Sequence, residues 1–313
     1  MVGPAVLGMA VLGAAVLGVA VLGMAILGVA ASAQAGTVTA ESFESPTLKR
    51  AWDYNVYLPD GYESRKLRYP VLYLLHGVGQ NRDEWVRNGQ IDRQADLLIA
   101  AGQIPPCVII MPTATNTWWV NGPERMQDAF FDDMVPYVDA HFRTINDQQA
   151  RVIAGESMGG FGALRLLLLH PHLFAAAALL SPAVYAPEPP EHSSSRTSPA
   201  FMTDGVFDSG KWTRRNYPAL IDGFAAAHLS IPLYIMSGIE DEFHIQDQAR
   251  LLFQTWRKRN WPGRLLLIAG RHNFETWRPA MPDALRYIFR RVRWPVPEAS
   301  RLATLPYVSR RTP

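Results

Sequence analysis

Apolar and polar positions along the chain follow two alternating periods, and this alternation predicts strands and helices in turn. The segment 51–58 alternates apolar and polar residues, as a half-buried strand does. The run at 71–75 is continuously apolar, which is typical of a strand buried on both faces of a sheet. Further strands are expected at 107–111, 151–155, 174–180, 232–237 and 264–269.

Segments with helical spacing separate these strands. They lie at 91–101, 126–142, 158–170, 246–259 and 279–291. Strands that alternate with helices predict an α/β domain with a mostly parallel central sheet and helices on both faces. Because no linker-like break divides the series, we expect residues 36–313 to form a single domain.

The segment 183–212 departs from this pattern, because it is rich in proline and serine and has no clear period. A long loop inside a compact domain is usually functional or disordered. Its place between two expected strands would suit a cap over a site, and a surface excursion is the alternative.

The N-terminus has a composition of its own. Residues 1–40 carry no charge, and glycine recurs every five residues from Gly3 to Gly28. The apolar stretch has about the length that spans a bilayer, and it ends in ASA (31–33) and AQA (33–35), which fit signal peptidase. The lack of an early Lys or Arg and the long apolar run are unusual for a signal. We expect residues 1–35 to be a signal peptide, cleaved after Ala33 or Ala35, or an uncleaved membrane anchor, with a misassigned start site as a third reading. The protein is then exported: periplasmic, secreted or membrane-anchored.

Composition and charge exclude several classes of function. The 313 residues include 30 Lys and Arg against 28 Asp and Glu, and this near-balance argues against a dedicated nucleic-acid binder. The single cysteine, Cys107, excludes an internal disulfide and a multi-cysteine metal site. There is no H-E-x-x-H motif or Cys/His cluster. We therefore expect no nucleic-acid partner, no metal and no cofactor.

The strongest chemical motif is GESMG at 155–159, which fits G-x-S-x-G. It falls between an expected strand and an expected helix, the context of a nucleophile elbow. Glycines at 155 and 159 would allow the tight turn that points the Ser157 hydroxyl outward. The start of the following helix would offer backbone N–H groups to an oxyanion. We therefore predict that Ser157 is a nucleophile.

A serine nucleophile needs a base and an acid, which in this arrangement follow it along the chain. His272 comes directly after the last expected strand, at the carboxyl edge of the sheet, and is preferred to His228 and His244, which lie in or before helices. The acid should follow the strand 232–237, where three carboxylates crowd together. We choose Asp241, with the neighbouring glutamates as alternatives.

The oxyanion hole of such a site takes one N–H from the residue after the nucleophile and one from the loop after an early strand. These positions correspond to Met158 and to Val78, in the turn that follows the strand 71–75. His76 precedes the serine in the chain, so we expect it to support this turn.

These motifs also carry a resemblance. The stretches LYLLHGVG (72–79), NRDEW (81–85), RVIAGESMGGFGAL (151–164), FAAAALLS (174–181) and HNFETW (272–277) resemble the "putative esterase" family of α/β-hydrolases. That family contains feruloyl and acetylxylan esterases, S-formylglutathione hydrolases, siderophore esterases and the antigen 85 mycolyltransferases. The likeness covers about residues 50–290 and is greatest to the feruloyl-esterase-like branch.

The resemblance implies the α/β-hydrolase fold with a catalytic domain over residues 36–313. It places the family's serine, acid and histidine on Ser157, Asp241 and His272, and its oxyanion amides on Val78 and Met158. The segment 183–212 has no match in the family pattern, and it borders the acyl pocket in such folds.

The segment after the strand 107–111 resembles the family's aromatic-plus-Asn loop near the active site, here Trp118, Trp119 and Asn121. Two adjacent exposed indoles would suit stacking on a sugar or an aryl acid. The alternative is that one indole lies in the core and the other at a rim.

The sequence therefore predicts a serine carboxylic-ester hydrolase that acts through an acyl-enzyme. We expect its substrate to be a small or aryl acyl ester of a sugar or similar alcohol. An acyltransferase of the antigen 85 type uses the same acyl-enzyme and passes the acyl group to a sugar hydroxyl, so it stays open. A non-catalytic envelope binding protein is disfavoured because all three triad residues are present.

Overall fold

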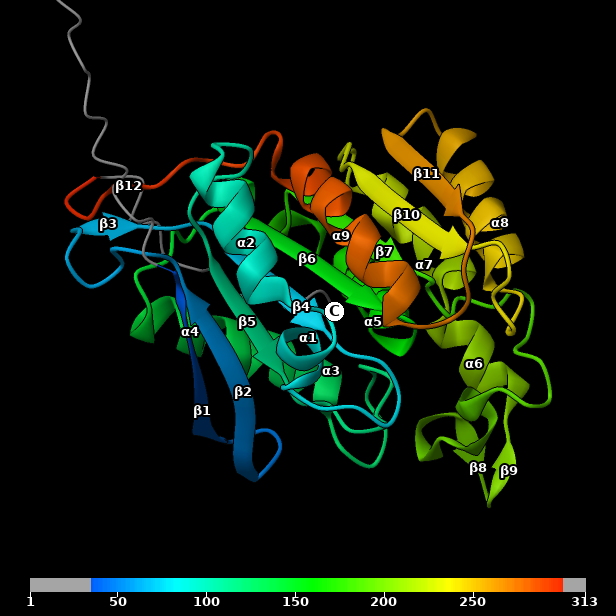
Figure 1. Cartoon of the computed structure of the whole chain (residues 1–313). Coiled ribbons are helices and arrows are strands. Elements are labelled where there is room, and N and C mark those ends of the chain that lie inside the picture. Colours follow the sequence, from blue (N-terminus) through cyan, green and yellow to red (C-terminus); the bar gives the residue numbers. More distant parts are fainter. Residues whose placement is uncertain (1–34, 301–313) are drawn as a thin grey trace, which may run out of the picture. The chain divides into compact units, whose positions relative to one another are not determined.

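One large sheet organises the chain in the computed structural model, which describes residues 35–300 (Figure 1). Its strand order is β1-β2-β5-β4-β6-β7-β10-β11. The strands from β5 to β11 run parallel, whereas β2 is antiparallel to β5 and to β1. The bounds are β1 Thr37–Ser45, β2 Arg50–Leu58, β4 Val71–Leu75, β5 Val108–Pro112, β6 Arg151–Glu156, β7 Ala176–Leu180, β10 Leu233–Gly238 and β11 Gly263–Ile268.

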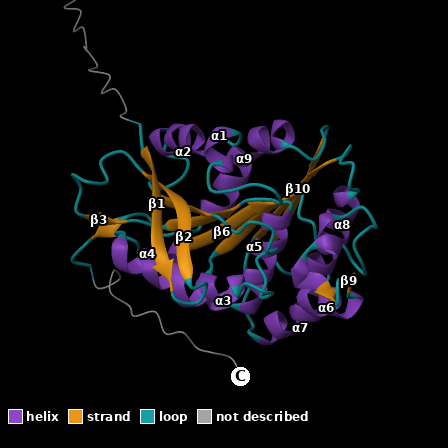
Figure 2. Ribbon diagram, turned by 90° about the horizontal axis from the view of Figure 1, so that it is seen from below, coloured by secondary structure: helices purple, strands orange, loops and turns teal. Residues whose placement is uncertain are grey.

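Helices cover both faces of this sheet (Figure 2). On one face lie α1 Glu84–Arg87, α2 Ile91–Ala100 and α9 Phe274–Phe289. On the other lie α3 Met126–Ala129, α4 Val135–His141, α5 Met158–Leu169, α7 Tyr217–Ala226 and α8 Ile245–Arg257. Successive residues of β4 enter opposite cores, with Tyr73 in one and Leu74 in the other, so every position of the strand is buried. This is the predicted α/β-hydrolase fold.

The closing helix begins earlier than its sequence suggests. The prediction placed this helix at 279–291. In the structure α9 begins at Phe274, where the Asn273 side chain accepts the Thr276 N–H at 3.2 Å and caps the helix. Pro279 and Pro282 then lie inside the helix.

The helix expected at 126–142 contains a turn of wider pitch. A π-helical segment, Phe130–Met134, joins α3 to α4. Within it, the Asp133 carboxylate accepts the Ser45 hydroxyl, and it accepts the Thr47 N–H and hydroxyl at 3.0 Å each. The segment thus ties this helix to the β1–β2 hairpin.

The segment 183–212 is more regular than predicted. It holds two 3-10 helices, Ser194–Thr197 and Pro199–Phe201, a small hairpin of β8 (Met202–Thr203) and β9 (Val206–Phe207), and the start of α6 (Ser209–Arg215). Phe201 and Trp212 are fully buried, and the Trp212 indole N–H donates to the Tyr185 carbonyl at 3.0 Å. These elements could not be predicted because each is too short to show a period of apolar residues.

The smaller elements complete the described part of the chain. A two-stranded sheet pairs β3 (Leu67–Arg68) with β12 (Val296–Pro297), and 3-10 turns lie at Gln148–Ala150 and Pro171–Leu173. Over residues 35–300, no helix is both long and apolar enough to cross a bilayer. The predicted signal peptide or anchor at 1–35 lies almost wholly outside the described residues.

Candidate active site

Ser157 occupies a strained turn between β6 and α5. Its φ of 54° and ψ of −118° are unfavourable for a residue with a Cβ. The surrounding backbone holds this conformation: the Ser157 N–H donates to the Leu180 carbonyl at 2.9 Å, and the Ser157 carbonyl accepts the Ala183 N–H at 3.1 Å. The turn places the side chain at the carboxyl edge of the sheet, as the motif predicts.

The two glycines of the motif make this turn sterically possible. A Cβ added at Gly155 would lie 2.4 Å from backbone atoms of Gly159, and one added at Gly159 would lie 2.2 Å from the Leu75 carbonyl oxygen. Both distances are far below van der Waals contact. The helix can therefore start against the end of β4 only if these positions lack side chains.

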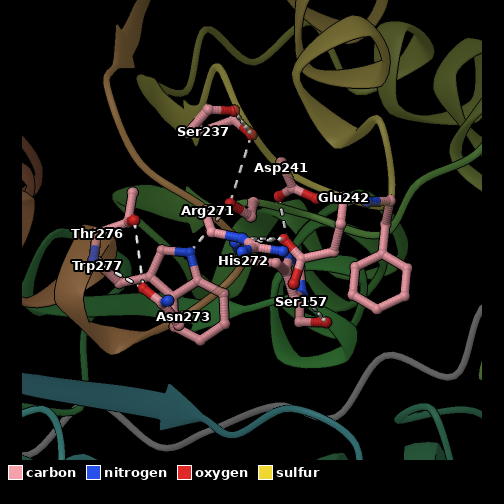
Figure 3. Close-up of polar contacts among 12 residues, drawn as sticks. Ser157, Ser237, Asp241, Glu242, Arg271, His272, Asn273, Thr276 and Trp277 are labelled. Atoms are coloured by element: carbon pink, nitrogen blue, oxygen red, sulfur yellow. Dashed lines mark hydrogen bonds and ion pairs between the residues drawn. The ribbon is translucent and has the colours of Figure 1, made fainter.

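The structure brings the three predicted triad residues into one hydrogen-bonded chain (Figure 3). The Ser157 Oγ lies 2.8 Å from His272 Nε2, and His272 Nδ1 lies 2.7 Å from Asp241 Oδ2. The Asp241 side chain is fully buried, and its second oxygen accepts the Phe243 N–H at 3.0 Å. In this geometry the imidazole donates from Nδ1 to the carboxylate, which leaves Nε2 to accept the serine proton.

The neighbouring carboxylates take other positions. The Glu242 carboxylate accepts the backbone N–H of His272 at 3.1 Å and does not contact the ring nitrogens (Figure 3). Glu240 is exposed. The imidazole packs at a steep angle against two aromatic rings, with ring centroids 4.9 Å from both Phe243 and Trp277. Of the three crowded carboxylates, the structure sets Asp241 against the imidazole.

A buried histidine fixes the turn that carries Val78. His76 Nδ1 donates to the Gly77 carbonyl at 2.7 Å, and its Nε2 accepts the Ala114 N–H at 2.9 Å. Burial lowers the pKa of His76 to about 4, so the ring is neutral, as these two bonds require. Because a trans peptide points its C=O and N–H in opposite directions, holding the Gly77 carbonyl also sets the direction of the Val78 N–H.

The predicted oxyanion donors are available for a ligand. Met158 is the first residue of α5, where backbone N–H groups have no partner within the helix. Among residues 35–300, no protein acceptor takes the N–H of Val78 or of Met158. Val78 lines the same pocket as Ser157.

A pocket of about 790 Å³ opens at the serine and histidine, a volume common for small-molecule sites. Aromatic and polar side chains share its walls. They include Phe243, Phe274, Trp277, Gln80, Asn88, Asn273, Glu275 and Arg278. His192 and Ser194 also line it, so the segment 183–212 forms part of one wall.

The expectation of exposed indoles at Trp118 and Trp119 is wrong. Their exposed fractions are 2% and 0%, and neither lines the pocket. Both residues have positive φ, 58° and 56°, which turns the chain so that both indoles enter the core. The Trp118 ring packs edge-on against Phe161 and Trp212, with centroids 5.5 and 5.9 Å away.

Asn121 has a structural environment as well. Its amide donates to the Asp128 carboxylate at 2.7 Å, and its oxygen accepts the Asp128 N–H at 3.1 Å. It does not line the serine pocket. The aromatic residues that do were missed, although Phe243 and Phe274 each follow a triad residue by two positions.

No metal centre competes with this site in the described part of the chain. Over residues 35–300 no group of three or more His, Cys, Asp or Glu side chains is arranged to hold an ion. Cys107 is fully buried, and burial raises the pKa of its thiol, so it is not an activated nucleophile.

Comparisons with known proteins point in one direction. A family model described as "Putative esterase" matches residues 45–288. An endo-1,4-beta-xylanase/feruloyl esterase of Xylanibacter ruminicola is 34% identical over 163 residues, which are 49% of this chain and 22% of that protein. An esterase of Mycobacterium tuberculosis is 35% identical over 135 residues, 40% of this chain and 27% of that protein. The chain thus spans only about a quarter of the length of these relatives.

Solved structures agree on the fold. A ferulic acid esterase superposes with a TM-score of 0.72 at 26% identity, covering 82% of this chain and 98% of that one. A fluorophosphonate-binding serine hydrolase of Staphylococcus aureus superposes with a TM-score of 0.70 at 24% identity, covering 82% and 99%. The matched family region contains Ser157, Asp241 and His272, and the chain belongs to the "Putative esterase" family of α/β-hydrolases.

Proposed function

We propose that the protein is a serine carboxylesterase that works through an acyl-enzyme on Ser157. The observation that carries the proposal is the hydrogen-bonded chain from Ser157 through His272 to Asp241 beside an open pocket. His272 takes the serine proton as Oγ attacks the ester carbonyl, and Asp241 holds the ring in the required tautomer. A serine without these two hydrogen-bonded partners has no base to take its proton.

The remaining steps use the same groups. The N–H groups of Val78 and Met158 receive the charge that develops on the carbonyl oxygen. His272 then gives its proton to the departing alcohol, and the acyl group stays on Ser157. Water attacks this acyl-enzyme while His272 takes its proton, and the carboxylic acid leaves as the serine is reprotonated.

For the substrate we propose a small or aryl acyl group carried on a sugar or similar alcohol. With the indoles at 118 and 119 buried, the aromatic faces that support this choice are those of Phe243 and Phe274. Polar side chains of the same pocket, Asn88 among them, suit the hydroxyl groups of an alcohol. A relative and a solved structure carry the names feruloyl esterase and ferulic acid esterase.

The purified full-length protein and its Ser157→Ala variant test the proposal. Each is assayed on p-nitrophenyl acetate, methyl feruloate, acetylated xylan and p-nitrophenyl palmitate. The variant should lose on the order of 10⁶-fold in kcat, and more than a few per cent of residual activity would refute Ser157 as nucleophile. Faster turnover of the palmitate than of the acetate or feruloate would refute the substrate class.

The acyltransferase alternative is separated by the product. With a sugar added as acceptor, an acyltransferase yields the acylated sugar in place of free acid, which mass spectrometry distinguishes. A protein that binds the esters and releases neither product would be the envelope binding protein.

A further inference from the structure

The residue before the nucleophile is a fully buried acid that contacts the oxyanion turn. Glu156 ends β6 with none of its surface exposed, and its Oε1 accepts the Gly77 N–H. The same N–H is shared with Gln80 Oε1 at 2.9 Å. A Cβ added at Gly77 would lie 2.6 Å from Glu156 Oε2, so the carboxyl group lies directly against the Gly77 Cα. A side chain at position 77 would force this carboxyl group to move.

The two ends of the Gly77 residue are therefore held from opposite sides. Glu156 takes the N–H, and His76 donates to the C=O. The Val78 N–H belongs to the peptide unit of that carbonyl, so its direction depends on both contacts. Glu156 also lines the pocket that contains Ser157.

The environment of the carboxyl group favours its uncharged form. Among the described residues Glu156 forms no ion pair, and its Oε2 has no hydrogen-bond partner. Burial raises its pKa to about 8, the Gly77 N–H acts to lower it, and the charge of Glu84 on α1 raises it further. The other titratable or charged groups near it are His76 and, around the pocket, His192, His272, Glu275 and Arg278.

We propose that Glu156 is a positioning residue of the oxyanion hole, which holds the Gly77–Val78 turn as an uncharged acid. This inference rests on the proposed esterase function. A carboxylate in the same place would hold the turn equally well, but it would put a negative charge beside the oxygen on which negative charge develops. In a buried site that repulsion is poorly screened and opposes the transition state. The uncharged acid supplies the acceptor without that repulsion.

The proposal predicts the pH dependence of the reaction. The kcat of the natural protein should fall as pH rises through about 8, because Glu156 then ionises. Glu156→Gln keeps a carbonyl acceptor for the Gly77 N–H and cannot ionise, so its kcat should stay level over the same range. Glu84→Gln removes a repelling charge, so its kcat should begin to fall at lower pH than that of the natural protein.

A third variant, Glu156→Leu, separates positioning from charge. Glu156→Leu has a similar size but no acceptor, so the Gly77 N–H keeps only Gln80. Its kcat should fall at every pH by on the order of 10- to 100-fold, part of the cost of losing one oxyanion donor, with KM changed much less. A purely structural residue would instead change the amount of folded enzyme and leave the kcat of the folded fraction unchanged.

The experiment measures kcat and KM on p-nitrophenyl acetate from pH 6 to 10 for the natural protein and these variants, with Ser157→Ala as the blank. Active-site titration counts the folded fraction. If kcat falls at alkaline pH in both the natural protein and Glu156→Gln, or in neither, the proposal is overturned. The proposed esterase function would not be affected by that result. If Glu156→Gln does not fold, an unmoved profile in Glu84→Gln overturns the proposal for Glu156. Activity retained in Ser157→Ala would sink the proposed function instead.

Discussion

Glu156→Gln should remove a contribution to stability that Glu156 loses as pH rises from about 4.5 to 8. Burial raises the pKa of Glu156 from 4.5 to about 8 in the folded chain. The folded state therefore keeps a proton that the unfolded chain releases above pH 4.5. The associated stability is fully present below the unfolded pKa and is lost as pH rises through the folded one.

The magnitude follows from the distance between the two pKa values. About 8 minus 4.5 is about 3.5 pH units. At about 1.36 kcal/mol per unit this corresponds to a loss on the order of 5 kcal/mol in the free energy of unfolding. Such a loss is a large part of the 5 to 15 kcal/mol typical of a domain, so it should be easily measured.

His76, on the other side of Gly77, has the opposite effect. Burial lowers its pKa from 6.5 to about 4, so the folded state resists a proton that the unfolded chain takes up. Its contribution is present above pH 6.5 and is lost as pH falls to about 4, on the order of 3 kcal/mol in all. These two groups together place maximum stability between about pH 4.5 and 6.5.

Urea unfolding at pH 5, 6.5, 8 and 9 tests this expectation. The free energy of unfolding of Glu156→Gln, minus that of the natural protein, should increase with pH and level off above about 8. The His76 contribution should remain in both proteins. Between pH 5 and 6.5 it offsets the Glu156 loss in the natural protein, so the free energy of unfolding should be level there, whereas in Glu156→Gln it should fall toward pH 5. Glu240→Gln, at an exposed carboxyl group, is the matched control and should run parallel to the natural protein. Parallel curves for Glu156→Gln would refute the reasoning.

Three further substitutions test the site and its surroundings. Asp241→Asn should lower kcat on the order of 10⁴-fold, because the imidazole loses its fixed tautomer, whereas Glu240→Gln should change kcat little; steady-state kinetics would expose the reverse order. Trp119→Ala should lower the free energy of unfolding by about 3 to 5 kcal/mol, measured in urea, because the indole is fully buried; a change in KM alone would contradict this. Phe243→Ala should raise KM for an aryl ester more than for the acetate, since a lost ring contact costs about 1 kcal/mol; equal effects on both esters would argue against a ring contact.

Local patterns in the sequence were sufficient to predict the centre of the sheet. β4 and β6 are buried on both faces. Most residues of such a strand must be apolar, so the strand can be predicted from its own sequence alone. β1 was missed for the converse reason. Within residues 35–300 it pairs only with β2, and most of its residues are exposed, so burial does not constrain its sequence, TVTAESFES.

The triad residues could be predicted because each follows a strand. The carboxyl ends of parallel strands meet at one edge, so Ser157, Asp241 and His272 converge whatever the loops between them do. No comparable rule predicts whether a side chain in a loop is exposed or buried. Trp118 and Trp119 are buried and have two consecutive positive φ angles. Tryptophan rarely adopts a positive φ, so the sequence gives no sign of this conformation.

The contact between Glu156 and Gly77 shows why the second layer of the site was not predictable. The two residues are 79 positions apart, and their contact depends on the register in which Leu75 pairs with Gly155. With that register, Gly77, just beyond β4, lies against the buried carboxyl group of Glu156 at the end of β6. In the sequence, position 156 is only the first of the two variable residues of G-x-S-x-G. Its burial follows from the pairing of β4 with β6, and its uncharged state follows from the burial, so neither property belongs to the motif alone.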